Sequence, residues 1–287
     1  METRPGRLIC VQPRATRAVS VTGTECAMNC AHCGGRYLAG MADLRATPFE
    51  SSGGVGGEGR HQVRSLLVSG GCDAGGVVPL AREAERLRVL RRRFRLNAHP
   101  GLVDEAGAEA IAGWADVASL DFVADPATMR EVYGLKAEPE RYAAALRALK
   151  ERLPVVPHLC LGLRGGQMGG EYEALEVLGR EGIDALVVLI FIPTPGSRYA
   201  DRTPPPVEEV AAFLSAARAR LPGVRLTLGC MRPGGRYRTA VDLAAVEAGV
   251  DAIVQPAPAA RKLAVRLGRE LIPYDECCAF LSADDHP

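Results

Sequence analysis

Three cysteines near the start of the chain have a spacing suited to an iron–sulfur cluster. Residues 23–35 read GTECAMNCAHCGG and place Cys26, Cys30 and Cys33 in a Cys-x3-Cys-x2-Cys pattern. Three thiolates on a [4Fe–4S] cube leave one iron open to a chelating ligand, whereas ferredoxins usually supply four cysteines because electron transfer needs no open site. The motif therefore predicts a [4Fe–4S] cluster that also binds a small molecule.

A zinc site is the competing interpretation of the same residues. Tetrahedral zinc accepts three cysteines and a histidine, and His32 lies between Cys30 and Cys33. However, His32 is adjacent to Cys33, which is closer than the usual spacing of separate zinc ligands. The spacing thus favours the cluster over zinc.

The rest of the chain alternates between apolar β-rich segments and helical patterns, which predicts a parallel sheet covered by helices. Strands are expected at 18–22, 65–69, 94–97, 117–122, 155–161, 185–192, 224–228 and 252–254. Helices are expected at 79–92, 126–152 (with Pro139 as a candidate break), 171–180, 206–220, 237–247 and 258–267. Eight β units suit a single α/β domain of the (β/α)8 TIM-barrel type, full or nearly closed. A doubly wound open sheet is the alternative.

We expect one barrel domain over residues 1–287, with an N-terminal extension at about 1–17 and a cysteine-containing C-terminal tail at about 268–287. The Gly/Ser-rich segment 51–59 is expected to be a mobile loop. A formal net charge of +1 gives no field that favours nucleic acid or an anionic membrane. The first residues are polar and no apolar run approaches the ~20 residues of a membrane span, so a cytoplasmic protein is expected.

Polar or small residues follow several of the expected strands, where barrel enzymes gather their binding groups. Gly70 and Gly71 follow the second strand, and paired glycines let the backbone approach a ligand closely. Asn97 ends the third strand and Asp121 the fourth. Arg164 follows the fifth, and its forked guanidinium could bind a carboxylate.

The CxxxCxxC motif directly after the first strand resembles the signature of the radical S-adenosylmethionine (SAM) superfamily. The resemblance implies that the amino and carboxylate groups of SAM chelate the open iron. It also implies that reduction of the cluster yields a 5′-deoxyadenosyl radical, which removes a hydrogen from the substrate. SAM would be held by residues that match the superfamily's pattern or lie at the corresponding strand ends, namely Gly70, Gly71, Asn97, Asp121 and Arg164. Two departures are His32, where many members have another aromatic residue, and Cys72, where an acidic residue often lies.

Two further segments resemble the biotin synthase and lipoyl synthase branch of this superfamily: LGLRGGQ at 161–167 and IPTPGS at 192–197. GCMRP at 229–233 and the Cys277-Cys278 pair resemble the two-protein lipoyl synthases of archaea and some bacteria. This resemblance implies sulfur insertion into a protein-bound octanoyl chain. The implied partners are a lipoyl-carrier or H-protein-like substrate, a second radical SAM subunit, and an electron donor such as ferredoxin or flavodoxin.

Six cysteines lie outside the triad. Cys160 is inside an expected strand and is interpreted as a small buried hydrophobe. The other five are candidate ligands of an auxiliary iron–sulfur cluster of the kind that sulfur-inserting members carry, with Arg232 as a possible neighbour: Cys10, Cys72, Cys230, Cys277 and Cys278. We expect the C-terminal tail to return over the barrel and bring its cysteines to the site.

Two other functions remain open at this point. The first is biotin-synthase-like chemistry, or another radical SAM reaction on a small molecule. The second is a non-catalytic iron–sulfur carrier, which explains the many cysteines but not the Gly70-Gly71 turn or the polar groups at the strand ends.

Overall fold

The structure is a computed structural model that describes residues 6–47, 49, 62–136 and 138–282. The loop predicted at 51–59 lies outside the described residues.

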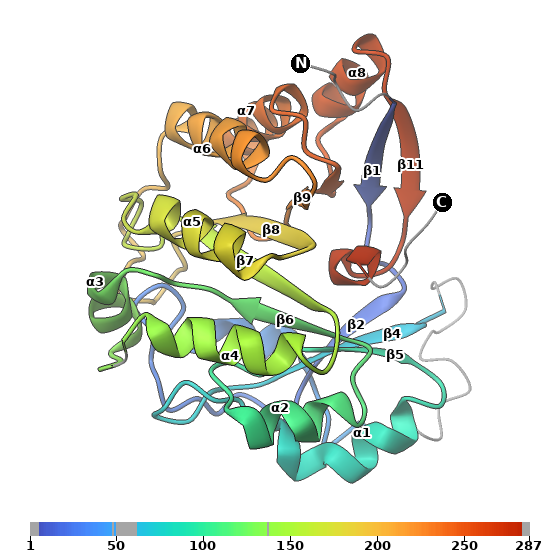
Figure 1. The fold of residues 1–287 in the computed structure, drawn as a ribbon, viewed down its shortest axis with the longest axis vertical. Helices are drawn as coiled ribbons and strands as arrows, with labels where there is room; N and C mark the ends of the chain where they lie inside the picture. Colours follow the sequence, from blue (N-terminus) through green and yellow to red (C-terminus); the bar gives the residue numbers. More distant parts are fainter. Residues whose placement is uncertain (1–5, 48, 50–61, 137, 283–287) are drawn as a thin grey trace.

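The centre of the molecule is one curled parallel sheet of 11 strands (Figure 1). Its strand order is β11-β1-β10-β9-β8-β7-β6-β5-β4-β2-β3. The strands are β1 (Arg7–Val11), β2 (Thr16–Ser20), β3 (Ala42–Asp43), β4 (Ser65–Ser69), β5 (Arg95–Ala98), β6 (Val117–Asp121), β7 (Val155–Leu161), β8 (Ala185–Ile190), β9 (Arg225–Leu228), β10 (Ala252–Val254) and β11 (Glu270–Tyr274). Each of the eight strands predicted from the sequence is present, and the α/β fold with a parallel sheet is confirmed.

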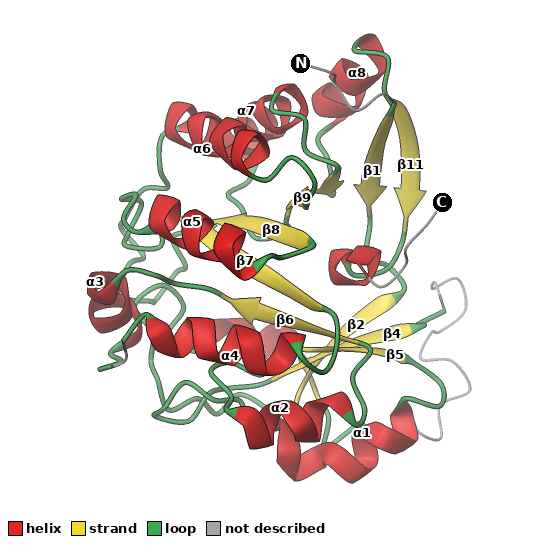
Figure 2. Cartoon of the chain, viewed as in Figure 1, coloured by secondary structure: helices red, strands yellow, loops and turns green. Residues whose placement is uncertain are grey.

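Helices cover the outer face of this sheet (Figure 2). They are α1 (Ala84–Leu90), α2 (Glu105–Ala112), α3 (Pro126–Thr128), α4 (Glu140–Lys150), α5 (Glu171–Glu181), α6 (Val207–Arg220), α7 (Gly235–Glu247) and α8 (Pro258–Arg266), with the short turns η1 (Arg36–Gly40), η2 (Leu80–Glu83), η3 (Met129–Tyr133) and η4 (Cys278–Ser282). The expected break at Pro139 is confirmed, because α4 begins directly after it. Helix α2 is absent from the sequence prediction, although Asp104 caps it by accepting a hydrogen bond from the Gly107 N–H (2.9 Å).

The sheet forms a half-barrel, and barrel closure is not found. Within the described residues the hydrogen-bonded ladder has two ends, β3 and β11. The segments interpreted as terminal extensions each contribute a strand at one side, because β1 pairs with β10 and with β11. Strand β11 contains Pro273, which has no N–H to donate; proline is tolerated in an edge strand and weakens the sequence signal for one.

The inner face of the half-barrel is filled at one end and accessible at the other. At the amino ends of the strands, Val117, Val156 and Ala185 are buried against the C-terminal turn η4. At the carboxyl ends, Asp121 is exposed and Cys160 only half-buried. The turn η4, the red coil near the C label in Figure 1, therefore closes the amino end of the inner face and is called the floor here, whereas the carboxyl end, called the upper surface, is accessible.

The floor is held by one aromatic ring and an ion pair. Phe280 is fully buried, and the Arg95 guanidinium lies over its ring, 4.4 Å from the centroid. Arg95 also forms an ion pair with Glu276 (3.4 Å), and the Cys277 N–H donates to Thr16 Oγ1 (2.7 Å). The tail is thus bound to the starts of β2 and β5.

We expect Phe280→Ala to lower the free energy of unfolding by about 3–5 kcal/mol, because it removes a buried ring and leaves a cavity. Chemical denaturation of the metal-free protein measures this. The control is Val265→Ala on α8, where the side chain is 57% exposed and the expected change is within about 0.5 kcal/mol. Equal effects of the two substitutions would show that the tail does not stabilise the half-barrel.

Candidate active site

The loop that carries the cysteine motif is fixed at its apex by two distant segments. The Ala31 N–H donates to the Val132 carbonyl in η3 (2.7 Å), and the Tyr199 N–H donates to the Ala31 carbonyl (3.1 Å). Asn29 has a φ of 47°, a left-handed conformation that asparagine tolerates better than most residues. The apex of the loop between Cys26 and Cys33 is therefore held by backbone hydrogen bonds to η3 and to the segment after β8.

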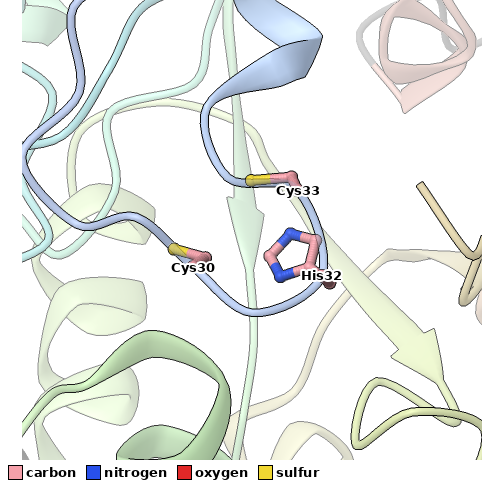
Figure 3. A group of neighbouring side chains, drawn as sticks. All are labelled: Cys30, His32 and Cys33. Carbon is pink, nitrogen blue, oxygen red and sulfur yellow. The ribbon is translucent and has the colours of Figure 1, made fainter. Parts of the chain in front are cut away.

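The three thiols of the motif share this loop. Cys30 is buried, and Cys26 and Cys33 are half-buried. The ligand atoms of Cys30, His32 and Cys33 all lie within 4.8 Å of one another (Figure 3). The Cys30 thiol donates a hydrogen bond to Cys33, which is the main reason that the pKa of Cys33 falls to about 4, while His32 also lowers it. The same hydrogen bond, together with burial, raises the pKa of Cys30.

This donor set fits a [4Fe–4S] cluster. A cube binds each thiolate to a different iron, so its ligands need not crowd around one point. Cys26 lies outside the 4.8 Å group formed by Cys30, His32 and Cys33, as a larger centre allows. That tight group of two thiols and an imidazole also has the ligand types of a single zinc ion. The geometry of the described residues thus keeps zinc as the competing occupant.

The Gly70-Gly71 turn packs directly on the cysteine loop. The Gly71 N–H donates to Thr22 Oγ1 (2.7 Å), and that hydroxyl donates to the Glu25 carbonyl (2.9 Å). A Cβ on Gly71 would lie 1.9 Å from the Glu25 carbonyl oxygen and 2.6 Å from the Cys26 Cα. Only glycine fits here, so the pair serves at least to let the two backbones touch beside Cys26.

Gly71→Ala is therefore expected to displace the cysteine loop. We expect a loss of most of the iron bound after anaerobic reconstitution and a destabilisation of about 1–3 kcal/mol from overpacking. Gly223→Ala is the matched control, because a Cβ there meets nothing within 4 Å. Iron content per chain and urea midpoints are the measurements. Full iron in the Gly71 variant would mean that the loop adapts and the packing argument fails.

The residues predicted to hold SAM differ in burial and in the hydrogen bonds and ion pairs that their side chains already form. Asp121 is exposed at the carboxyl end of β6. Asn97 is fully buried, and its amide is held between Ser119 Oγ (3.0 Å) and Cys277 Sγ (3.6 Å). Arg164 forms ion pairs with two carboxylates of the chain, Asp125 (3.7 Å) and Glu131 (3.3 Å). The assignment of these side chains to SAM stays a prediction, and of the three, Asp121 is the one whose carboxylate is exposed with no hydrogen bond or ion pair found among the described residues.

The Pro-Thr-Pro-Gly segment after β8 contacts the cysteine loop through η1. Tyr37 hydroxyl and Thr194 Oγ1 are hydrogen-bonded (2.8 Å), and Arg36 donates to the Gly196 carbonyl (3.1 Å). The segment that carries part of the family resemblance thus lies next to the motif residues, on the same side of the half-barrel.

The five candidate ligands of a second cluster fall into three different places. Cys10 points away from the inner face and is buried in the core under the helices. Cys72 lies beside the triad, because its carbonyl accepts from the Ala27 N–H (2.9 Å). The remaining three come together on the inner face at the floor, of which Cys278 is the first residue: Cys230, Cys277 and Cys278. The structure therefore does not gather the five thiols around one centre.

The three inner thiols influence one another's protonation. Burial raises the pKa of Cys230, and the neighbouring Cys277 raises it further, although Cys230 remains exposed to solvent. Cys278 donates a hydrogen bond to Cys277, which lowers the pKa of Cys277 and raises that of Cys278. Arg232 lies near Cys230, but its guanidinium is buried in an ion pair with Asp242 (2.8 Å) and donates to the Val254 carbonyl (2.7 Å). It is therefore bound to helix α7 rather than free to act as a ligand.

A histidine pair beside Asp121 was not expected from the sequence. The rings of His99 and His158 meet edge to face with centroids 5.2 Å apart. Burial, and then His158, lowers the pKa of His99 to about 4, and burial lowers the pKa of His158, so the neutral form of both rings is favoured. Both follow the alternation of inward-facing residues on β5 and β7, which a strand-by-strand comparison of the sequence could have revealed.

Comparison with known proteins gives similarity of fold only. No protein-family model matches the chain, and no curated protein sequence matches it. Among solved structures, methylornithine synthase (PylB) superposes with a TM-score of 0.62 at 16% identity, covering 88% of this chain and 73% of PylB. The hydrogenase maturase HydG from Carboxydothermus hydrogenoformans gives 0.54 at 14% identity, covering 86% of this chain and 58% of HydG.

A third similar structure is SuiB of Streptococcus suis, solved with SAM bound. Its TM-score is 0.54 at 13% identity, and the match covers 79% of this chain and 52% of SuiB. The chain thus spans about half to three-quarters of the lengths of these proteins. The half-barrel is shared with a protein that binds SAM. No helix among the described residues is long and apolar enough to cross a membrane.

Proposed function

We propose that the chain is a radical SAM enzyme whose Cys26, Cys30 and Cys33 hold a [4Fe–4S] cluster. The observation that carries the proposal is the three-thiol loop, shaped by its own hydrogen bonds and packed on Gly71 at the carboxyl ends of a parallel half-barrel. The shared fold of SuiB, solved with SAM bound, supports SAM as the cofactor.

When bound, the cluster and SAM would supply radical chemistry that removes hydrogen from the substrate. The protein's part would be to hold the cluster through the thiolates of Cys26, Cys30 and Cys33 at the accessible carboxyl ends of the strands, and to exclude bulk water from the amino end. The η4 floor and the buried Phe280 close the lower end of the inner face. Asp121, at the upper end, is placed to accept hydrogen bonds from a bound cofactor.

For the reaction we propose sulfur insertion into a protein-bound octanoyl chain, as in lipoyl synthesis. An auxiliary iron–sulfur cluster would supply the sulfur, and its proposed ligands are Cys230, Cys277 and Cys278, because these three thiols lie near one another on the inner face at the floor. Asn97, which already donates to Cys277 Sγ, would hydrogen-bond a sulfur ligand of this cluster. The proposed partners are a lipoyl-carrier or H-protein-like substrate, a second radical SAM subunit, and ferredoxin or flavodoxin as electron donor.

The test uses anaerobically reconstituted protein with dithionite, SAM and an octanoyl-lysine peptide, with and without a candidate second subunit. We expect 5′-deoxyadenosine in all reactions and a thiolated peptide, detected by mass spectrometry, when both subunits are present. Release of 5′-deoxyadenosine without sulfur in the peptide would retain radical SAM chemistry and reject the lipoyl assignment. Dethiobiotin as substrate tests the biotin-synthase-like alternative in the same assay.

A zinc protein is the second candidate, favoured by the close group of Cys30, His32 and Cys33. Metal analysis of protein purified without oxygen separates the two candidates. Iron and sulfide in equal amounts support the cluster, whereas one zinc per chain without sulfide would reject it. A non-catalytic iron–sulfur carrier would bind iron but release no 5′-deoxyadenosine.

A further inference from the structure

Exposed arginines surround the apex of the cysteine loop. They come from η1, from η3 and from the segment after β8, and they are called the arginine surface here: Arg36, Arg130, Arg198 and Arg202. None of the four forms an ion pair with a carboxylate within the described part of the chain. By contrast, Arg147 on α4 is paired with both Glu140 and Glu181. The guanidinium charges of the arginine surface are therefore available to another molecule.

Contacts between η3 and the segment after β8 join three of these arginines. Arg198 Nη2 donates to the carbonyl of Glu131 (3.4 Å), the residue after Arg130. The Tyr199 hydroxyl donates to the carboxylate of Glu131 (2.5 Å), and the Arg202 guanidinium lies over the Tyr199 ring, 5.7 Å from its centroid. The two segments thus form one continuous surface.

This surface has an excess of positive charge. The carboxylates of η3 and of the segment after β8 are Glu131 and Asp201. Glu131 is already bound by Arg164 (3.3 Å) and by the Tyr199 hydroxyl. Asp201 is therefore the one remaining carboxylate of these segments to oppose the arginine surface.

The arginine surface lies directly over the loop that carries the motif thiols. Ala31, the residue after Cys30, is fully buried, and its backbone is hydrogen-bonded to η3 and to the segment after β8. The His32 ring meets the ring of Tyr133 in η3, with centroids 5.7 Å apart. Arg36 follows the motif and donates to a carbonyl of the segment after β8. A partner bound to these arginines would thus contact the segments that cover the thiols.

We propose that the arginine surface is the docking site of the electron donor, a small acidic one-electron carrier of the flavodoxin type. The inference rests on the proposed function and adds where on the chain the donor binds. Guanidinium groups without a carboxylate of their own attract an acidic partner, and complementary charge raises the rate of encounter. Complexes between electron-transfer partners are small and weak, so a few charged contacts are enough to form one.

The step that this contact serves is the transfer of one electron. One electron leaves the donor, which is oxidised, and enters the cluster, which is reduced. No covalent bond between the two proteins forms or breaks. The arginines take no part in the transfer itself, because their role is to hold the donor close to the cysteine loop.

Direct binding tests the docking site without any turnover. Oxidised flavodoxin is titrated into the reconstituted protein by calorimetry at low and at high salt. We expect the double variant Arg130→Gln with Arg202→Gln to bind about tenfold more weakly than the wild type at low salt, and high salt to remove most of this difference. Arg130→Lys with Arg202→Lys keeps both charges and is expected to keep most of the affinity.

The matched control changes the same number of charges elsewhere. Arg261→Gln with Arg266→Gln alters two exposed arginines of α8, which follows β10, and β9 separates that strand from β8 in the sheet. We expect this pair to bind flavodoxin like the wild type. Equal weakening in both pairs would show that only the net charge of the chain matters, and unchanged affinity in the Arg130 and Arg202 pair would equally overturn the docking site.

Release of 5′-deoxyadenosine gives the second readout. With reduced flavodoxin as donor we expect the Arg130 and Arg202 glutamine pair to lose about tenfold in kcat/KM for flavodoxin. With dithionite and methyl viologen, a small cation that arginines do not attract, we expect the wild-type rate. An equal loss with both reductants would mean that the arginines act on the cysteine loop rather than on the donor, and would overturn the proposal.

Two further outcomes separate this proposal from its neighbours. Weaker binding of an octanoylated H-protein-like carrier to the glutamine pair, with unchanged binding of flavodoxin, would assign the surface to the substrate carrier and reject it as the donor site. A wild-type protein that releases no 5′-deoxyadenosine with methyl viologen would reject the proposed function itself, whereas failure of the docking site alone leaves that reaction intact.

Discussion

Alanine in place of Cys30 is expected to abolish reductive SAM cleavage and to remove about four irons per chain. Cys30 is the buried member of the motif and donates to Cys33, so its loss removes one ligand and disturbs the next. The measurement is 5′-deoxyadenosine release under dithionite, with iron and sulfide determined on the same samples.

The matched control for this experiment is Cys160→Ala. Cys160 is a half-buried thiol on β7 that faces the same side of the sheet but belongs to neither group of thiols. We expect it to keep its iron and its SAM cleavage. If Cys30→Ala still cleaves SAM at the wild-type rate, the assignment of the triad to a cluster is wrong.

The sequence predicts the strands well because each buried parallel strand is a short apolar run between helical patterns. The run ALVVLI of β8 is an example, since five of its six residues are buried. The strands β1 and β11 were missed for different reasons. Residues 7–11 form only a short apolar run, and β11 has no fully buried residue and contains Pro273. The predicted full or near closure of the barrel is not confirmed, because the number of strands does not determine whether the two edge strands pair.

The arrangement of cysteines shows what a motif can and cannot predict. The local spacing of Cys26, Cys30 and Cys33 places them on one loop in any fold. Cys72 and Cys230 both follow strands, which correctly places them at carboxyl ends. However, β4 neighbours the strand that leads into the triad, whereas β9 is separated from β4 by four other strands. Strand order, which depends on long-range pairing, therefore assigns the two thiols to different groups.

The position of the tail depends on contacts even farther apart in the chain. Cys277 is held by Thr16 and Asn97, from two strands near the other end of the sequence. Cys277 lies inside the half-barrel because Phe280 packs at the amino ends of the strands. This packing depends on distant residues, so the local sequence does not predict it. Asn97 shows the same limit, since it was expected to help hold SAM and is buried, with its amide donating to Cys277 Sγ.

The second prediction with a large expected effect concerns the iron bound by the three inner thiols, Cys230, Cys277 and Cys278. We expect a variant with Cys26, Cys30 and Cys33 all changed to alanine to keep about half of the wild-type iron after anaerobic iron–sulfide reconstitution. The remaining iron would be bound by Cys230, Cys277 and Cys278, because thiolates brought together without metal repel one another and iron would stabilise them as ligands. Changing Cys277 and Cys278 as well should remove that remainder.

Two controls separate ligation from folding in this experiment. Cys10→Ala in the triad-free background should leave the remaining iron unchanged, since Cys10 is buried on the opposite face of the sheet. Phe280→Ala should reduce iron at the inner site only, because the floor positions Cys277 and Cys278 without belonging to the cysteine loop. A triad-free variant that binds no iron would show that this chain carries a single cluster. The sulfur for the reaction would then have to come from the partner subunit.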